Sequence, residues 1–343
     1  MADKYRFGIV GCGTVAYHHA DSIASTENAE LVAVCDIKEE KARSFAEEYG
    51  VEKYYTDYQE MLKDDEIDVI SVCTISGLHA ENSIDAAKAG KHILCEKPIA
   101  LNKKDLDQIE VEVKKNNVKM QCVFQTRIKP EYQAVKEAID NNVFGKTILA
   151  DAVLKFYRSQ EYYDSADWRG TWEFDGGGSL MNQGIHGIDI LLWLAGDVES
   201  VFGRSAALVR DIEVEDTAAA VVKYKNGAFG TIEATTSVYP GQERRFAIHG
   251  EKGSAIFTEN GIIEWAIEGE EDVQPPQFET KKEDTSQDPT KFSRTSHVPM
   301  VKDLIEAIDK DKDPSIPPAE GRKAIDLILA IYESSKTGKE VLV

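Results

Sequence analysis

A glycine-containing turn close to the N-terminus constrains the fold more than any other part of the chain. Residues 6–10 are an apolar, strand-like run. The sequence Gly-Cys-Gly-Thr-Val-Ala follows at 11–16, then a helix-like run and a second apolar run that ends at Asp36. A strand, a glycine turn, a helix and a second strand with a terminal acid form the unit that binds a dinucleotide in Rossmann folds. The alternative is an ordinary tight turn in an α/β protein, and Asp36 argues most against it.

The residues of this turn match what a bound dinucleotide requires. Gly11 permits the tight turn, Gly13 has no side chain to keep the pyrophosphate from the backbone, and Ala16 lets the helix pack closely. The free N–H groups at the start of the helix attract phosphates. We therefore predict cofactor contacts for Gly11, Gly13, Thr14, Val15 and Asp36.

Asp36 also bears on which dinucleotide is bound. A carboxylate at this position accepts hydrogen bonds from the adenosine ribose hydroxyls and repels a 2′-phosphate. We therefore expect NAD, although Lys38 offsets part of the repulsion and leaves NADP open.

Charge and cysteine content argue against several classes of protein. The chain has 40 basic and 61 acidic residues, a net charge of −21 that disfavours nucleic acid and anionic membranes as partners. No apolar run approaches the roughly 20 residues that span a bilayer, and no signal peptide is recognisable. The five cysteines form no Cys-x-x-Cys pair. We expect them to be reduced and buried, in a cytoplasmic protein without a metal site.

The chain is long enough for two domains. In residues 1–124, strand-like runs at 6–10, 30–35, 69–73, 92–95 and 120–124 alternate with helix-like runs at 15–25, 39–49, 58–63, 80–89 and 103–116. This alternation predicts a NAD(P)-binding Rossmann domain with a doubly wound parallel sheet. Ligands of such sheets bind beyond the carboxyl ends of the strands.

Residues 125–343 are expected to form a second, α+β domain for substrate binding and oligomerisation. After a helix at 127–141, strand-like runs at 147–157, 198–208, 216–224, 227–237, 244–249, 254–258 and 262–267 predict a large, mostly antiparallel open sheet. The last three runs resemble a meander. Such a sheet needs helices or a second subunit to cover its faces. A polar loop at 268–296 and helices at 298–309 and 319–336 complete the prediction.

Two segments contain side chains suited to catalysis. Glu96-Lys97-Pro98 ends a predicted parallel strand, where the proline fixes the backbone, is able to be cis and aims the lysine inward. The alternative is a surface lysine in a loop. In the second segment three glycines precede a helix predicted from Ser179 to Leu194, on which Asn182, His186 and Asp189 share one face. A histidine there suits proton exchange near neutrality, and the alternative is a satisfied core histidine.

Aromatic and basic residues are interleaved at 157–172. Trp168-Arg169-Gly170-Thr171-Trp172 follows Tyr157-Arg158 and Tyr162-Tyr163, a composition that suits sugar rings and anionic groups. A packed aromatic cluster is the competing interpretation. His79, after another strand end, either touches the cofactor or caps the next helix.

Several segments resemble the Gfo/Idh/MocA oxidoreductases, and the likeness covers essentially the whole chain. These segments are the turn at 11–16, Ala89-Gly90-Lys91-His92 with Glu96-Lys97-Pro98, the glycine-rich stretch ending at His186, and the tail at 320–339. The resemblance implies a Rossmann domain and a second domain whose open sheet often buries its face in a homodimer or homotetramer. It also implies oxidation or reduction of secondary alcohols of sugars, sugar nucleotides or cyclitols, with Lys97 catalytic. Many members have an Asp-x-x-x-His pair. Here the histidine is His186 but the aspartate position is Asn182, which weakens a specific inositol dehydrogenase assignment.

The resulting hypothesis is an NAD(P)-dependent dehydrogenase in which His186 removes the hydroxyl proton, Lys97 stabilises the oxygen and Asn182 orients the ring. The predicted catalytic residues are Lys97, His186 and Asn182, and the predicted substrate-binding residues are Lys97, Gln125, Arg127, Asn182 and His186. Further cofactor contacts are predicted for Thr74, His79, Glu96, Lys97, Trp168 and Arg169. An NAD-dependent glycosidase, a sugar-nucleotide 3-dehydrogenase and a non-catalytic dinucleotide sensor remain alternatives, because a fold does not fix a function.

Overall fold

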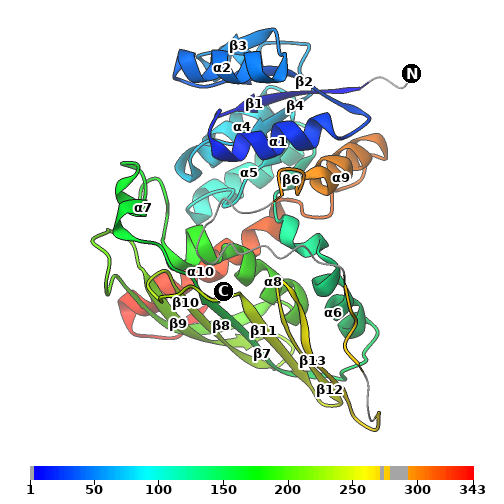
Figure 1. The fold of residues 1–343 in the computed structure, drawn as a ribbon, viewed down its shortest axis with the longest axis vertical. Coiled ribbons are helices and arrows are strands. Elements are labelled where there is room, and N and C mark those ends of the chain that lie inside the picture. The colour runs from blue at the N-terminus through cyan, green and yellow to red at the C-terminus, as the bar shows by residue number, and fades with distance from the viewer. Residues whose placement is uncertain (1–3, 271–273, 279–292) are drawn as a thin grey trace. The chain divides into compact units, whose positions relative to one another are not determined.

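The computed structural model describes residues 4–270, 274–278 and 293–343 and divides the chain into two compact units (Figure 1). Unit 1 contains Met1–Gln125 and Ser293–Arg322, and unit 2 contains Thr126–Phe292 and Lys323–Val343. The chain first passes from unit 1 to unit 2 between Gln125 and Thr126, next to the expected domain boundary at 124/125. Residues 293–322, however, were expected in the second domain and belong to unit 1. The polar loop expected at 268–296 lies largely outside the described residues.

The packing of α9 (Val298–Asp309) accounts for the place of residues 293–322 in unit 1. Its apolar face, which includes Met300 and Leu304, is buried and contacts α1, β5 and β6 of unit 1. The next residues are held by the backbone as well, since the Cys122 N–H donates to the Ile316 carbonyl at 2.9 Å. The chain therefore returns to complete the first core before it enters unit 2 again.

Unit 1 is a doubly wound parallel sheet, as predicted, with the strand order β3-β2-β1-β4-β5-β6 that is typical of dinucleotide-binding folds. Its strands are β1 (Tyr5–Val10), β2 (Ala29–Cys35), β3 (Lys53–Tyr55), β4 (Val69–Val72), β5 (His92–Cys95) and β6 (Met120–Cys122). Its helices besides α9 are α1 (Thr14–Ala24), α2 (Glu39–Tyr49), α3 (Tyr58–Leu62), α4 (His79–Lys88) and α5 (Lys103–Lys115). Two short 3₁₀ helices are η1 (Ser76–Leu78) and η2 (Gln125–Ile128), and η2 continues into unit 2. Among these strands only β3 was not predicted, because three residues at a sheet edge are too few to show a period.

Unit 2 is built on an eight-stranded sheet with the order β13-β12-β11-β7-β10-β9-β8-β14. Its strands are β7 (Thr147–Lys155), β8 (Val198–Ala206), β9 (Thr217–Tyr224), β10 (Phe229–Thr235), β11 (Arg245–Gly250), β12 (Gly253–Thr258), β13 (Gly261–Ile267) and β14 (Val341–Leu342). The pair β7–β10 is parallel, the other pairs are antiparallel, and β11–β13 form the predicted meander.

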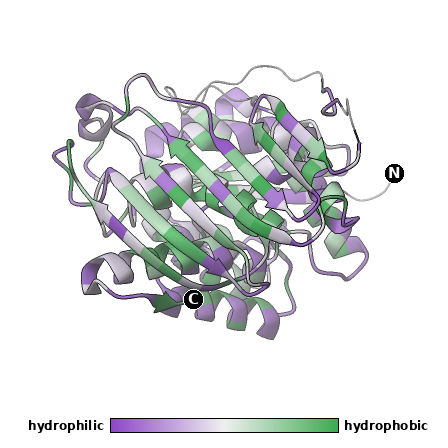
Figure 2. Cartoon of the chain, turned by 90° about the horizontal axis from the view of Figure 1, so that it is seen from below, coloured by the Kyte–Doolittle hydropathy of each residue, from purple (hydrophilic) through white to green (hydrophobic). Residues whose placement is uncertain are grey.

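Helices cover one face of this sheet. They are α6 (Pro130–Asp140), α7 (Gln160–Asp164), the π-helix η3 (Ser179–Gly184), α8 (Ile185–Ala195) and α10 (Pro318–Thr337), whose first residues belong to unit 1. The apolar helix α8 packs on β7, and α6 packs against α8. The core of unit 2 therefore lies between α8 and the buried strand residues Ala152 and Leu154. Seen from below, the strands of this sheet lie in front of its helices, and none of the described helices covers them (Figure 2).

Candidate active site

The turn between β1 and α1 has the geometry that a dinucleotide requires. Gly11 has a positive φ of 90°, and a Cβ atom there would lie 2.7 Å from the Cys73 carbonyl oxygen, so only glycine fits. A Cβ on Gly13 would meet no atom within 4 Å, so the backbone is open to an approaching group. Gly13 is also the N-cap of α1 and has no side chain to cap the free N–H groups of the first turn, which are donors suited to a phosphate.

Asp36 is held beside the same turn. Its carboxylate accepts the Cys12 N–H at 3.0 Å and the Lys38 N–H at 2.9 Å. These bonds fix one oxygen toward the glycine turn and the other toward the chain that follows β2. The position fits a carboxylate that recognises ribose hydroxyls.

His79 links the loops at two neighbouring strand ends of unit 1. Its Nδ1 lies 2.8 Å from the Pro98 carbonyl and its Nε2 lies 2.9 Å from the Thr74 carbonyl. Thr74 in turn donates its hydroxyl to Asn82 at 2.9 Å. The His79 ring is buried, and burial lowers its pKa. The ring therefore supports the loops, and direct cofactor contacts of His79 and Thr74 stay predictions.

Glu96 lies in a buried cluster with two histidines that sequence reasoning missed. One carboxylate oxygen is 2.9 Å from His19 Nε2 and 3.0 Å from His297 Nε2. Burial alone would raise the pKa of Glu96, but the hydrogen bonds from His19 and His297 hold it well below its ordinary value. Such side chains are also metal ligands, yet at these distances they already satisfy one another. His297 lies more than 200 residues along the chain from Glu96 and carries no local signal.

Lys97 follows this cluster directly. Its N–H donates to the other Glu96 oxygen at 3.3 Å, and the Lys97–Pro98 peptide is cis, an option that the sequence had left open. The buried cluster thus anchors the strand end that carries the lysine. The structure assigns the Glu96 side chain this positioning role, and a direct contact with the cofactor stays a prediction.

The predicted helix from Ser179 begins as the π-helix η3 and continues as α8. Asn182 therefore lies in the π segment, and His186 and Asp189 lie on α8. Asp189 is buried and forms a two-pronged ion pair with Arg127, at 2.8 and 2.6 Å. Arg127 therefore helps to hold α8 in place, and its contact with substrate stays a prediction. His186 lies half-buried on the first turn of α8.

Asn182 has a carboxylate partner that sequence reasoning also missed. Its amide donates to Asp175, which is buried and accepts the Gly170 N–H at 2.9 Å as well. Where many relatives were expected to have an aspartate, this chain pairs an asparagine with an aspartate seven residues earlier. The position of Asp175 directly before the three glycines was the available signal.

A cluster of arginines and tyrosines adjoins Asn182. The Gln183 side chain donates to the side-chain amide oxygen of Asn182, Oδ1, at 2.6 Å and accepts from Arg158 Nε at 3.0 Å. Arg169 lies over the rings of Tyr162 and Trp168, at 4.4 and 4.5 Å from their centroids, and donates to the Tyr162 hydroxyl at 2.7 Å. A cationic surface of this kind favours planar anions. Cofactor contacts of Trp168 and Arg169, and a substrate contact of Gln125 at the start of η2, stay predictions.

Comparison with known proteins decides the family. The model of an oxidoreductase family with an NAD-binding Rossmann fold matches residues 5–124, and that of the GFO/IDH/MocA C-terminal domain matches residues 132–256. The chain belongs to the GFO/IDH/MocA oxidoreductases. It is therefore an oxidoreductase with NAD as its cofactor, and the open turn at Gly13 fits that cofactor.

Three family members illustrate the range of similarity. Myo-inositol 2-dehydrogenase of Thermotoga maritima is 33% identical over 261 residues, 74% of this chain and 75% of that protein. The WlbA dehydrogenase of Bordetella pertussis, solved with NADH and UDP-GlcNAcA, has a TM-score of 0.88 and 33% identity over 99% of both chains. Levoglucosan dehydrogenase, solved with NADH, has a TM-score of 0.89 over 99% of both chains, but its 23% identity supports the fold alone.

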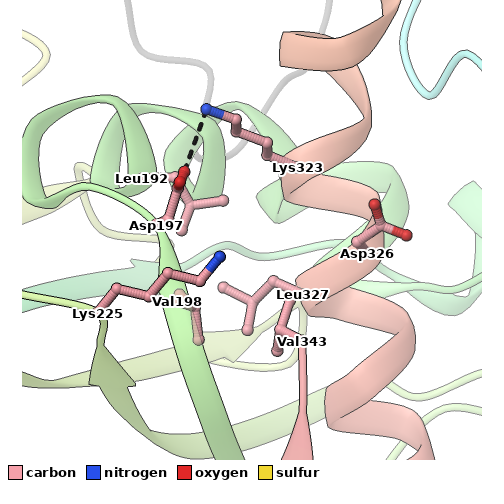
Figure 3. A pocket seen from close by; sticks show the side chains of 8 residues that line it. All are labelled: Leu192, Asp197, Val198, Lys225, Lys323, Asp326, Leu327 and Val343. Atoms are coloured by element: carbon pink, nitrogen blue, oxygen red, sulfur yellow. Dashed lines mark ion pairs between the residues drawn. The ribbon is translucent and has the colours of Figure 1, made fainter.

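A pocket in unit 2 lies apart from these residues (Figure 3). It is lined by Leu192, Asp197, Val198, Lys225, Lys323, Asp326, Leu327 and Val343, and Lys323 pairs with Asp197 at 3.1 Å. The predicted site residues are not among these lining residues. In the described part of the chain, no helix is both long and apolar enough to cross a membrane.

Proposed function

We propose that this family member oxidises a secondary hydroxyl of a negatively charged sugar, of the UDP-GlcNAcA type, with NAD as the acceptor. The main support for the proposal is the arginine cluster, which consists of Arg158, Arg169 and Arg210. Gln183 connects this cluster to Asn182, because its side chain forms hydrogen bonds with both Arg158 and Asn182. The similarity to the WlbA dehydrogenase, which was solved with UDP-GlcNAcA, supports the same substrate class.

Two of the arginines, Arg169 and Arg210, are available for an anion. Among the described residues, neither Arg169 nor Arg210 forms an ion pair with a carboxylate. The Arg210 guanidinium lies over Tyr157, 5.3 Å from the ring centroid, and Arg158 is buried against Tyr157 and Tyr162. Guanidinium groups held flat by aromatic rings keep their N–H donors aligned for carboxylate or phosphate oxygens.

A cyclitol is the second candidate, since Thermotoga maritima myo-inositol 2-dehydrogenase is also 33% identical, over 74% of this chain. An uncharged ring leaves the arginine cluster without a role. Asn182 also departs from the Asp-x-x-x-His pair. Both observations favour the charged sugar.

The catalytic roles follow from the side-chain chemistry. Bound NAD supplies the hydride acceptor. His186 takes the hydroxyl proton as a general base, and Lys97 donates a hydrogen bond to the same oxygen and stabilises its developing negative charge. Asn182, oriented by Asp175 and Gln183, hydrogen-bonds a ring hydroxyl.

Replacement of the lysine tests this assignment. Lys97→Met keeps the length of the side chain but removes its charge and its donors, so turnover should fall by about 10²-fold or more. NADH affinity, followed by fluorescence titration, should change little. Near-wild-type turnover in Lys97→Met would contradict the role.

The substrate is tested by NADH formation at 340 nm with UDP-GlcNAcA, UDP-GlcNAc and myo-inositol. Stoichiometric NADH with UDP-GlcNAcA, and much less with the two compounds that lack the carboxylate, is the expected result. A preference for myo-inositol would contradict the proposal. Cleavage of a glycoside without net NADH would favour the transient-oxidation glycosidase, and binding of NAD with neither reaction would favour a sensor.

We further propose a homodimer or homotetramer in a reducing, cytoplasmic compartment. All five cysteines are buried and unpaired with one another, which fits that compartment. The uncovered face of the large sheet bears exposed apolar side chains, which fits burial against a second copy.

A further inference from the structure

Two buried carboxylates stand side by side just before β9. Glu215 and Asp216 are 2% and 0% exposed. A buried carboxylate is costly unless hydrogen-bond donors surround it. Each of the two is surrounded by backbone donors, but from different segments.

Glu215 holds the start of the π-helix. One of its oxygens accepts the Gly178 N–H at 3.0 Å, and the other accepts the Leu180 N–H at 2.8 Å and the Ser179 hydroxyl at 3.2 Å. The Tyr332 hydroxyl donates to that second oxygen at 3.0 Å. The N–H groups in the first turn of a helix have no partner within the helix. Glu215 therefore fixes the turn that carries Asn182 and leads into His186.

Asp216 holds a loop that carries one of the arginines. Its carboxylate accepts the N–H groups of Leu208, Val209 and Arg210 at 3.0, 2.7 and 2.8 Å. The Thr217 hydroxyl adds a fourth bond at 2.8 Å. The loop is also tied to α7, because Gln160 exchanges two hydrogen bonds with Asp211, at 3.0 and 3.2 Å. Arg210 is thereby held over Tyr157.

We propose that Glu215 and Asp216 together fix the position of the anion-binding loop, residues 208–211, relative to the catalytic turn of unit 2 that carries Asn182 and His186. Because the two residues are adjacent in the chain, a substrate whose negative group binds Arg210 presents its reacting hydroxyl at a fixed distance along the Asn182–His186 turn. Both are positioning residues, and neither touches substrate. The inference rests on the proposed function, since it requires an anionic substrate.

A purely structural role predicts different kinetics. If the two carboxylates only stabilised unit 2, replacing either one would loosen both segments, and kcat and KM would change together. Separate positioning roles predict that the two replacements act on different constants. Asp216→Asn should raise KM for UDP-GlcNAcA about tenfold with kcat within twofold, as expected when ground-state and transition-state binding are lost equally. Glu215→Gln should lower kcat about 30-fold or more with KM within threefold.

The decisive measurement is a double-mutant cycle on KM with Arg210→Lys. If Asp216 acts through Arg210, the double variant Asp216→Asn/Arg210→Lys should have the KM of the weaker-binding single variant, whereas independent effects would multiply. Asp140→Asn, which removes a surface carboxylate paired with Lys136 on α6, is the matched control and should change neither constant. Tyr332→Phe replaces Glu215→Gln if the latter does not fold, and should lower kcat severalfold.

The outcomes separate the two proposals. Wild-type protein that neither binds nor oxidises UDP-GlcNAcA would overturn both the substrate assignment and this inference. Wild-type protein that uses UDP-GlcNAcA, with parallel changes of kcat and KM in both variants or with multiplying effects in the cycle, would overturn this inference alone.

Discussion

At the scale of single residues, we predict that Asp36 determines which dinucleotide is accepted. Asp36→Asn keeps the shape and one acceptor oxygen for the Cys12 N–H but removes the charge that repels a 2′-phosphate. We expect the ratio of kcat/KM for NADP to that for NAD to rise at least about tenfold, equivalent to ~1.4 kcal/mol. Parallel assays with both cofactors measure it, and Lys38→Ala should move the ratio the other way. An unchanged ratio in Asp36→Asn would show that another residue discriminates.

The Glu96 cluster predicts how stability depends on pH. The pKa of Glu96 is lowered in the fold from 4.5, so its ionised form stabilises the protein above that pH, and the contribution is lost as the pH falls. His19, whose pKa burial lowers from 6.5, adds a loss in the same direction below that value. Glu96→Gln should lower the stability at pH 7 by about 2 kcal/mol, because it replaces the charged acceptor of the hydrogen bonds to His19 and His297 by a neutral one.

Thermal unfolding from pH 7 to pH 3.5 tests this prediction. The difference between wild type and Glu96→Gln should shrink as the pH falls below about 5. Glu47→Gln, at an exposed position on α2, is the control and should follow wild type throughout. A constant difference over the whole range would contradict the assignment of the titration to Glu96.

Sequence pattern predicted residues whose role is local and missed those whose partners are distant. Gly11, Gly13 and Asp36 lie within one strand–turn–helix unit, so their spacing alone was informative. Asp175 and Glu215 act through hydrogen bonds to the glycine-rich segment and show no periodicity of their own. Tertiary contacts of this kind are set by the completed fold.

At the scale of elements, the glycine run before the π-helix is required by packing. A Cβ on Gly177 would lie 2.0 Å from the Tyr332 hydroxyl, and its φ is 150°. Gly177→Ala should therefore cost about 3 kcal/mol, from positive φ and displacement of a buried side chain. Because Tyr332 binds Glu215, kcat should fall as well.

A matched glycine separates these two causes. Gly50 also has a positive φ, 66°, but a Cβ there would meet no atom within 4 Å. Gly50→Ala should cost only about 1 kcal/mol and leave kcat unchanged. Urea unfolding and steady-state kinetics measure both variants, and equal losses in the two would refute the packing explanation.

The elements themselves were mostly predictable, and their irregularities were not. Period-2 and period-3.6 patterns located the strands and helices to within a few residues, because most of them bury one regular face. The π turn at 179–184 has no such signature, since its extra residue is accommodated by Glu215 and not by local propensity. The membership of α9 in unit 1 likewise depends on which core its apolar face completes.

At the scale of the whole molecule, the uncovered face of the large sheet predicts self-association. Phe202 pairs directly with Val221, and Leu149 pairs directly with Phe229, so apolar side chains meet across strands β8–β9 and β7–β10. They are 42%, 54%, 38% and 55% exposed in the single chain. A patch of this kind is costly in water and favours burial against a second copy.

Val221→Glu places a charge at the centre of this patch and should shift the protein toward a smaller species in size-exclusion chromatography with light scattering. Ile37→Glu makes the same change at a residue that is 88% exposed in unit 1, and it should leave the mass unchanged. A monomeric wild type, or a Val221→Glu variant with the wild-type mass, would contradict the interface. Because a two-fold interface contains each residue twice, one substitution introduces two like charges into it, and the loss of association should be larger at low salt.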